Sequence, residues 1–185
     1  MMCPPELQAL HPTKAAPVIQ DGNITLAESG AIVEYILTKY GGGKLALPPT
    51  SSDYADYLYF LHFANGYFQP ALLRYGPVMR SGASSDDLAA KFTKRGFEQS
   101  LQILEDRVGK HPWLAGAEFT AADIMNVCSL TTMRVFYPYS LEAYPAIVAY
   151  LKRVSERVGF QTATEKGDPG FERPIGAEKP LYGQR

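Results

Sequence analysis

The feature that most constrains the fold of this chain is a change of hydrophobic pattern within residues 14–36, KAAPVIQDGNITLAESGAIVEYI. Two short β-type runs, residues 17–20 and 23–26, flank Asp21-Gly22, a dipeptide that strongly favours a tight hairpin turn. The chain then switches to helical periodicity, and we expect an amphipathic helix from Ser29 to Tyr40. The segment therefore predicts a small α/β region, with a hairpin followed at once by a helix.

After this region the pattern becomes helical. A stretch rich in Gly, Pro and Ser, GGGKLALPPTSSD, has the composition of a linker. We predict four parts: an α/β region at 1–41, a linker at 42–50, an all-helical domain at 51–166 and an irregular tail at 167–185. Within the first long helix, Gly66 and Pro70 predict a kink, because proline removes a backbone hydrogen bond from a helix interior.

Apolar residues at helical spacing predict the inner faces of the later helices. They are Leu88, Phe92, Phe97, Leu101, Leu104 and Val108; then Ile124, Val127, Cys128, Thr131 and Val135; and finally Ile147, Leu151, Val154 and Val158 in a helix that begins at Tyr144-Pro145. On this pattern Cys128 is a buried packing residue. Thr120 and Asp123 form a capping-box pair, and we assign them to folding alone.

Composition narrows the possible functions. The chain has 185 residues, a net charge of −1 and no basic stripe, which disfavours a nucleic-acid partner. Only two cysteines occur, without metal-ligand spacing, so we expect neither a disulfide framework nor a metal site. The first residues lack the pattern of a signal peptide, and no apolar run approaches membrane-spanning length. We expect a cytoplasmic protein that does not enter membranes.

The pair Glu28-Ser29 places a carboxylate and a hydroxyl at the start of a helix. The first N–H groups of a helix lack partners within it, and the helix dipole makes that end partly positive. A ligand carboxylate suits this position, and Glu28 can pair with an ammonium group, so the corner fits an amino-acid head group. The alternative is an ordinary helix cap, since serine is among the commonest N-cap residues.

Three ordered segments carry a family resemblance: HPTKAAPVIQDGNITLAESGAIVEYI, PWLAGAEFTAADI and YPAIVAYLKRVSERVGFQ. From about Pro5 to Gln161 the chain resembles the glutathione transferases, most closely their fungal or bacterial branch. The resemblance implies an α+β to mostly α fold. A partial thioredoxin-like domain, consisting of the hairpin and one helix, would precede the all-α C-terminal domain of the family.

The resemblance also implies roles for particular residues. Pro17 would follow a cis peptide bond, and Val18 would offer its main-chain N–H and C=O to the cysteinyl part of glutathione. Glu28 and Ser29 would hold the γ-glutamyl end. Lys14 would approach the glycyl carboxylate, although it stands three positions before Pro17, one step from the usual place, and a solvated surface lysine is an equal alternative.

The resemblance leaves the catalytic residue unknown. In the family, a Ser, Tyr or Cys after the first strand activates the glutathione thiol, and this chain begins after that point. A strand, a helix and another strand, about 35–50 residues, would precede Pro5, so we expect an incomplete version of a longer protein. The alternative is that a partner covers the open edge of the hairpin. Cys3 is a poor substitute, because only 14 positions separate it from Pro17.

Two functions follow from the resemblance. The first is an enzyme that joins the thiolate of its co-substrate glutathione to small electrophiles, or reduces peroxides, as a homodimer without a metal. The second is a non-catalytic binding or assembly module of the same fold. His62, Asn65 and Gln69 would line the electrophile cleft of the enzyme, but we rank a core or dimer contact ahead of a substrate contact for this aromatic helix.

Overall fold

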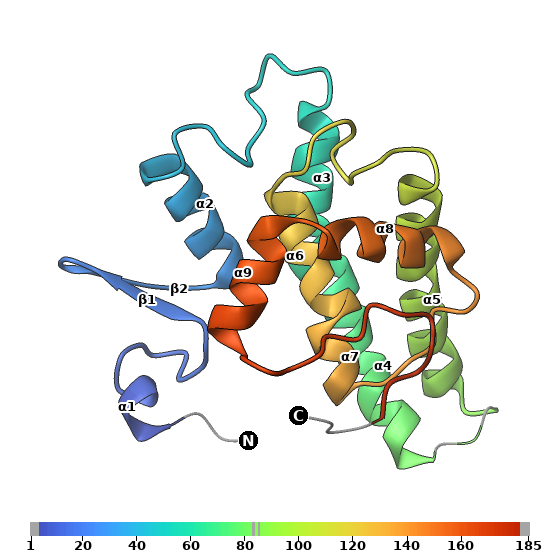
Figure 1. Cartoon of the computed structure of the whole chain (residues 1–185). Coiled ribbons are helices and arrows are strands. Elements are labelled where there is room, and N and C mark those ends of the chain that lie inside the picture. Colours follow the sequence, from blue (N-terminus) through green and yellow to red (C-terminus); the bar gives the residue numbers. More distant parts are fainter. Residues whose placement is uncertain (1–3, 83, 85, 182–185) are drawn as a thin grey trace. The chain divides into compact units, whose positions relative to one another are not determined.

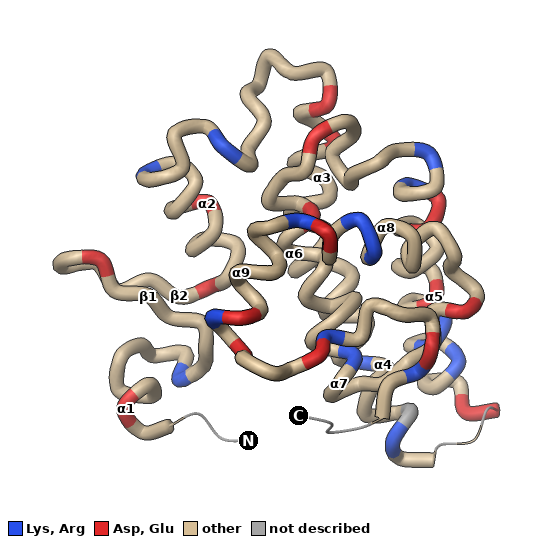
Figure 2. The backbone as a smooth tube through the Cα atoms, in the orientation of Figure 1, with Lys and Arg blue, Asp and Glu red and all other residues tan. Residues whose placement is uncertain are grey.

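The computed structural model describes residues 4–82, 84 and 86–181. The chain divides into two compact units, Met1–Ser51 and Ser52–Arg185, which are described separately below. Acidic and basic positions are interspersed along both of them (Figure 2). The fold is that of a partial thioredoxin-like unit followed by an all-helical unit, as the sequence predicts.

The described residues of the first unit form a hairpin and two helices (Figure 1). Its elements in chain order are α1 (Pro5–Gln8), β1 (Val18–Asp21), β2 (Ile24–Ala27) and α2 (Ser29–Lys39). The two strands are antiparallel, and the register pairs Val18 with Ala27 at one end and Asp21 with Ile24 at the other. Ala27 and Ile32 are buried where α2 packs on the hairpin.

The hairpin turn differs by one residue from the prediction. Asp21 belongs to β1, and the two loop residues are Gly22 and Asn23. Gly22 has φ 59°, a conformation that glycine adopts at little cost at the first position of a two-residue turn. The side chain of Asp21 is held by α2, as described below, which explains why this residue ends the strand and does not enter the loop.

The second unit contains the hydrophobic core. Its elements are α3 (Tyr54–Phe63), a π-helical turn η1 (Ala64–Phe68), α4 (Gln69–Ser81), α5 (Leu88–Val108), α6 (Ala121–Leu130), α7 (Thr132–Phe136), α8 (Pro145–Ser155) and α9 (Val158–Gly167). The irregularity expected near Gly66 and Pro70 takes the form of η1, which sits between two α-helices. Helix α3 packs against α6, and α5 packs against both α4 and α8.

A buried polar network fixes the start of α6. Thr120 and Asp123 form the predicted capping box, so their assignment to folding is confirmed. The Asp123 carboxylate also accepts hydrogen bonds from the Leu114 N–H at 2.9 Å and the Tyr150 hydroxyl at 2.9 Å. Burial raises the pKa of Asp123, and these donors oppose that rise. Glu105 of α5 accepts from two N–H groups in the first turn of α8, at 2.9 and 2.8 Å.

Several positions predicted to face the core are exposed. Leu88 and Phe92 are 82% and 80% exposed, because five residues turn a helix by about 140° and carry Phe92 away from the buried Phe97. In α6, Cys128 is exposed rather than buried, and Ile124 shares its outer face. Val127, Thr131 and Val135 are buried as predicted, and the inner face of α6 also carries the buried polar residues Asp123 and Asn126. Asn126 Nδ2 donates to Phe60 O at 2.8 Å.

The last helix of the prediction divides into two. Ile147, Leu151 and Val154 are buried in α8 as expected, but α8 ends at Ser155. Val158 begins α9 and is 76% exposed, so it does not belong to the inner face of α8.

The segment after α9 lacks helices and strands up to residue 181, yet it is held in place. Arg134 of α7 is fully buried and donates to the carbonyl oxygens of Tyr139, Pro174, Gly176 and Glu178 at 2.6–3.2 Å. The Leu141 N–H donates to Ala177 O at 2.7 Å. The segment runs alongside α7 (Figure 1), and one arginine is its main polar anchor among the described residues.

Candidate functional site

The hairpin register brings two of the predicted site segments together. Val18 begins β1 and lies directly opposite Ala27, which ends β2. Glu28 and Ser29 follow Ala27 immediately, so the main chain of Val18 and the start of α2 are neighbours within the first unit. The short loop of this hairpin fixes the register, and the register positions the corner.

The backbone at Glu28 has an uncommon conformation. Its φ of 72° and ψ of 113° place it outside the regions that a residue with a side chain adopts without cost. Such a conformation costs about 1–3 kcal/mol and occurs most often at functional sites. Glu28 is exposed, and its C=O accepts the first hydrogen bond of α2 from the Ile32 N–H at 2.9 Å. The carboxylate therefore stands in solvent beside the helix start.

Ser29 occupies the first helical position, and Glu28 is the N-cap residue. The N-cap position that the alternative gave to Ser29 is therefore held by Glu28. Ser29 and Gly30 are partly exposed, and the first N–H groups of α2 lie at the positive end of an eleven-residue helix. The arrangement combines a hydroxyl, helix N–H groups and a carboxylate in three consecutive residues.

Pro17 and Lys14 precede β1. The Ala16–Pro17 peptide is cis, which confirms the expected geometry of this bond. Lys14 is exposed, with φ 52°, and its N–H donates to His11 O at 3.0 Å. Lys14 lies in the loop before the hairpin and is not one of the paired strand residues, so the pairing that places Val18 near the start of α2 does not position Lys14.

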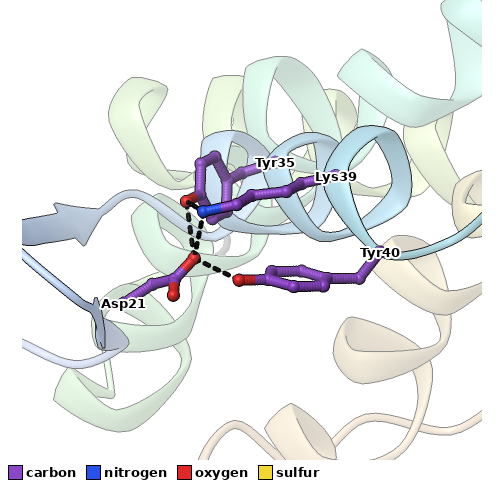
Figure 3. A network of polar contacts seen from close by, with 4 residues as sticks. All are labelled: Asp21, Tyr35, Lys39 and Tyr40. Atoms are coloured by element: carbon purple, nitrogen blue, oxygen red, sulfur yellow. Dashed lines mark hydrogen bonds and ion pairs between the residues drawn. The ribbon is translucent and has the colours of Figure 1, made fainter.

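Asp21 anchors the far end of the hairpin to α2 (Figure 3). Its Oδ2 accepts from Lys39 Nζ at 2.7 Å and from the hydroxyls of Tyr35 and Tyr40 at 2.6 and 2.5 Å. Lys39 Nζ also donates to the Tyr35 hydroxyl at 2.7 Å. The bond from Lys39, followed by those from the tyrosines, holds the pKa of Asp21 well below its usual range; the same bond raises the pKa of Lys39.

The sequence analysis did not identify this four-residue network. The spacing of Tyr35 and Lys39, four residues apart on one helix, is a signal that these two side chains meet. Their convergence on Asp21 depends on how α2 crosses the hairpin, which local patterns do not specify. The network positions the corner, since it fixes α2 against the strands that carry Val18 and Ala27.

Neither cysteine is assigned a catalytic role. Cys3 lies outside the described residues. Cys128 is exposed, but desolvation by the surrounding protein raises the pKa of its thiol and Arg173 offsets this only in part, so the thiolate is disfavoured. The described ranges contain no group of three or more His, Cys, Asp or Glu side chains arranged to bind a metal ion. No described helix combines the length and apolar character needed to cross a membrane.

The family comparisons agree with this geometry. Residues 63–157 match the family described as "Glutathione S-transferase, C-terminal domain", and residues 2–44 match "Glutathione S-transferase, N-terminal domain". A glutathione S-transferase of Arabidopsis thaliana is 30% identical over 155 residues, which cover 80% of this chain and 71% of that protein. One from Manduca sexta is 29% identical over 168 residues, covering 89% of this chain and 74% of the relative.

A solved structure shows the same fold. The crystal structure of a glutathione S-transferase from Actinobacillus pleuropneumoniae superposes with a TM-score of 0.75 at 29% identity, covering 89% of this chain and 74% of that one. The chain belongs to the glutathione S-transferase family. These relatives support a glutathione transferase activity at the level of the family.

Proposed function

We propose that the corner formed by Val18, Glu28 and Ser29 binds glutathione, and that the protein uses the bound thiol as a nucleophile. The observation that carries the proposal is the strand register. Val18 pairs with Ala27, so the extended main chain of β1 lies next to the start of α2. At that start, the positive end of the helix dipole and the negative carboxylate of Glu28 are adjacent. Two family members, from a sphingomonad and from Phanerochaete chrysosporium, were solved with glutathione or oxidized glutathione bound.

Each of the two charged groups on the α-carbon of the γ-glutamyl residue has a partner in this proposal. The α-carboxylate accepts from the Ser29 hydroxyl and from the first N–H groups of α2, where the helix dipole also favours negative charge. The α-ammonium pairs with the exposed carboxylate of Glu28. The strained backbone of Glu28 sets the direction in which its side chain leaves the helix start, and this pre-organisation lowers the cost of binding.

The rest of the tripeptide extends along β1. The sheet of the described residues has two strands, so β1 has one edge that no described strand pairs. Val18, next to the cis bond of Pro17, offers its main-chain N–H and C=O to the cysteinyl residue as an added strand would. Lys14 is the candidate partner for the glycyl carboxylate, from its exposed position in the preceding loop.

The reaction follows from thiol chemistry. A free thiol is mostly protonated near neutral pH, and attack requires the thiolate. The sulfur then forms a bond to an electrophilic carbon and the leaving group departs, or it attacks a peroxide oxygen and breaks the O–O bond. We assign no residue to thiol activation. A homodimer and a cytoplasmic location belong to the same proposal and rest on the resemblance to the family.

Calorimetric titration with glutathione tests the proposal. Glu28→Gln and Ser29→Ala each remove a partner of a charged group, worth about 1.5–3 kcal/mol, so we expect affinity to fall about 10- to 150-fold. Lys14→Gln tests the glycyl contact in the same titration. Glu6→Gln is the matched control, because Glu6 is exposed on α1, away from the paired strands, and its loss should leave the affinity unchanged.

Turnover of a chromogenic electrophile separates the two functions of this fold. Conjugation by the wild-type protein, reduced in parallel with affinity in the Glu28 and Ser29 variants, supports the transferase. Binding without turnover points to the non-catalytic module. Equal glutathione affinity in the wild type and in both corner variants would exclude the corner as the binding site.

A further inference from the structure

Two arginines of the helical unit contact the same indole ring. Arg153 lies in the last turn of α8, and Arg157 is the N-cap residue of α9. Their guanidinium carbons lie 6.0 and 5.6 Å from the ring centroid of Trp113, which belongs to the loop before α6. The short turn between α8 and α9 (Figure 1) therefore brings two positive charges to one tryptophan.

Aromatic rings hold both side chains in place. The Arg157 guanidinium lies over the Phe119 ring, with 3.7 Å from its carbon to the ring centroid, and that of Arg153 lies 6.0 Å from the Tyr150 centroid. Trp113 makes edge contacts with both of these rings, at centroid distances of 5.0 and 6.0 Å. The attraction between a guanidinium and a ring face uses the positive charge and leaves the N–H groups able to donate.

Most of these N–H groups have no acceptor within the chain. Each guanidinium carries five N–H donors. Arg153 Nη2 donates to Pro112 O at 3.2 Å, whereas the buried Arg153 Nε has no hydrogen-bond partner. The Arg157 side chain donates no hydrogen bond to the described residues, although it is only partly exposed. The pair therefore has donors to offer to a ligand.

Acidic side chains do not neutralise this pair. Glu118 and Glu156 stand close to these residues in sequence and are exposed, yet neither forms an ion pair with Arg153 or Arg157 in the part of the chain that the structure describes. Lys152, also exposed, adds a positive charge next to Arg153 in sequence. The two guanidiniums are thus held close to one ring without a compensating negative charge.

Other arginines of the helical unit that contact rings are compensated. Arg107 lies over a phenylalanine ring and forms an ion pair with Asp56 at 2.8 Å. Arg173 also lies over a phenylalanine ring, and it forms an ion pair with Asp168 at 3.2 Å. The buried Arg134 donates to carbonyl oxygens. The pair at Trp113 has the same kind of ring contact without an acidic side chain, and this difference points to an anion as its ligand.

We propose that the arginine pair at Trp113, defined by Trp113, Phe119, Arg153 and Arg157, binds a phosphate group, as free phosphate or as a small phosphate monoester. A planar guanidinium donates two parallel hydrogen bonds to phosphate oxygens. A phosphate monoester carries nearly two negative charges at neutral pH, which two guanidiniums balance and a single carboxylate does not. The site uses no residue of the proposed glutathione corner.

Trp113 can report on this site, because it is the only tryptophan in the sequence. Its indole N–H gives a single cross-peak in a ¹H–¹⁵N NMR spectrum, which is followed while inorganic phosphate or methyl phosphate is added at constant ionic strength. We expect a saturable shift that fits one site per chain, together with shifts of arginine Nε–H cross-peaks. Tighter binding of methyl phosphate identifies a monoester as the ligand, and tighter binding of inorganic phosphate identifies the free ion.

Variants locate the site. Arg157→Gln and Arg153→Gln each remove one guanidinium and should weaken phosphate about tenfold. Arg157→Lys keeps the charge but loses the planar group, so it should weaken phosphate about threefold. Lys166→Gln is the matched control, because it removes one exposed positive charge from the last turn of α9 and should leave the affinity unchanged. Circular dichroism establishes that each variant is folded, and Arg157→Lys decides the matter if a glutamine variant is not.

Three results would overturn the proposal. The first is the absence of a saturable shift at the Trp113 indole and at the arginine Nε–H groups. The second is an equal shift when chloride replaces phosphate at the same ionic strength. The third is a phosphate affinity that the folded Arg157 variants leave unchanged, or that Lys166→Gln lowers as much as they do. None of these measurements involves glutathione, so they test this site separately from the proposed function.

Discussion

At residue 28 the backbone conformation and the side chain serve different purposes. The positive φ of Glu28 costs free energy in the folded state, whereas its carboxylate contributes nothing to the cap of α2, since it makes no capping hydrogen bond. The main chain of Glu28 serves the fold, because its C=O accepts the first hydrogen bond of α2, but the side chain has no role in that cap. We assign the side chain to the ammonium group of glutathione.

Substitution of Glu28 by glycine separates the free-energy cost of its backbone conformation from the role of its side chain in binding glutathione. Glu28→Gly removes the strain but adds the entropy of a more flexible unfolded chain, so we expect stability to stay equal or rise by about 0–2 kcal/mol while glutathione affinity falls at least tenfold. Leu45→Gly is the matched control, because Leu45 also has a positive φ, 63°, and no proposed ligand contact. Urea unfolding and calorimetry provide both quantities. A loss of stability above about 1 kcal/mol in Glu28→Gly would contradict this interpretation.

At the scale of elements, the hairpin and α2 are joined by the four-residue network around Asp21. Its free-energy contribution depends on pH through Asp21 at the acid end and through Lys39 and Tyr40, whose pKa values are both raised, at the alkaline end. The pKa of Asp21 is lowered from its ordinary value of 3.8, so its contribution is complete above that value and is lost as the pH falls through it. The pKa of Lys39 is raised from 10.5, so its contribution is complete below that value and is lost at higher pH.

The network therefore predicts a plateau of stabilisation between about pH 5 and pH 10. We expect the difference in thermal midpoint between the wild type and Asp21→Asn to be constant across this range and to shrink below pH 4. Glu98→Gln provides the comparison, because Glu98 and Lys94 form an ion pair at 3.5 Å with both side chains about half exposed, and such pairs contribute little. A difference that grows on acidification would refute the assignment.

Local signals explain which elements could be predicted. The hairpin, the start of α2 and the capping box of α6 depend on residues close in sequence, and all three are present. Local patterns could not predict which residues of α6 are exposed. Ile124 and Cys128 have the apolar character of core residues but are exposed, whereas Val127 of the same predicted stripe is buried. Asp123 and Asn126 take inward positions because they hydrogen-bond to the Leu114 N–H and to Phe60 O.

The same reasoning applies to the candidate site. Glu28 and Ser29 were identifiable because they are adjacent in sequence. The pairing of Val18 with Ala27 could not be predicted, because the expected turn at Asp21-Gly22 would place Val18 opposite Thr25, whereas the observed turn at Gly22-Asn23 places it opposite Ala27.

At the scale of the whole molecule, a single buried cation holds the segment around residues 174–178 against α7. The sequence predicts an irregular tail, and the segment is irregular, but Arg134 attaches it to α7 through carbonyl groups about 40 residues away in sequence. Arg134 is fully buried, and desolvation lowers the pKa of its guanidinium from the ordinary value. The carbonyl dipoles compensate a charge that has no acidic partner among the described residues.

Arg134→Met should release this segment. The substitution keeps an unbranched side chain but removes every donor, and we expect a loss of about 2–5 kcal/mol in urea unfolding. The amide of Leu141, which donates to Ala177 O, should exchange with solvent much faster. Arg74→Met removes an exposed arginine of α4 and should change neither quantity. Unchanged exchange at Leu141 in Arg134→Met would show that other contacts hold the segment.

The central claim is that the helix start beside β1 recognises the γ-glutamyl head group, and a structure determined with glutathione at saturating concentration tests it most directly. The account predicts the α-carboxylate within hydrogen-bonding distance of the Ser29 hydroxyl and the α2 N–H groups, the ammonium against Glu28, and the cysteinyl main chain alongside Val18. Glutathione bound elsewhere, or this corner left without ligand at saturation, would contradict it.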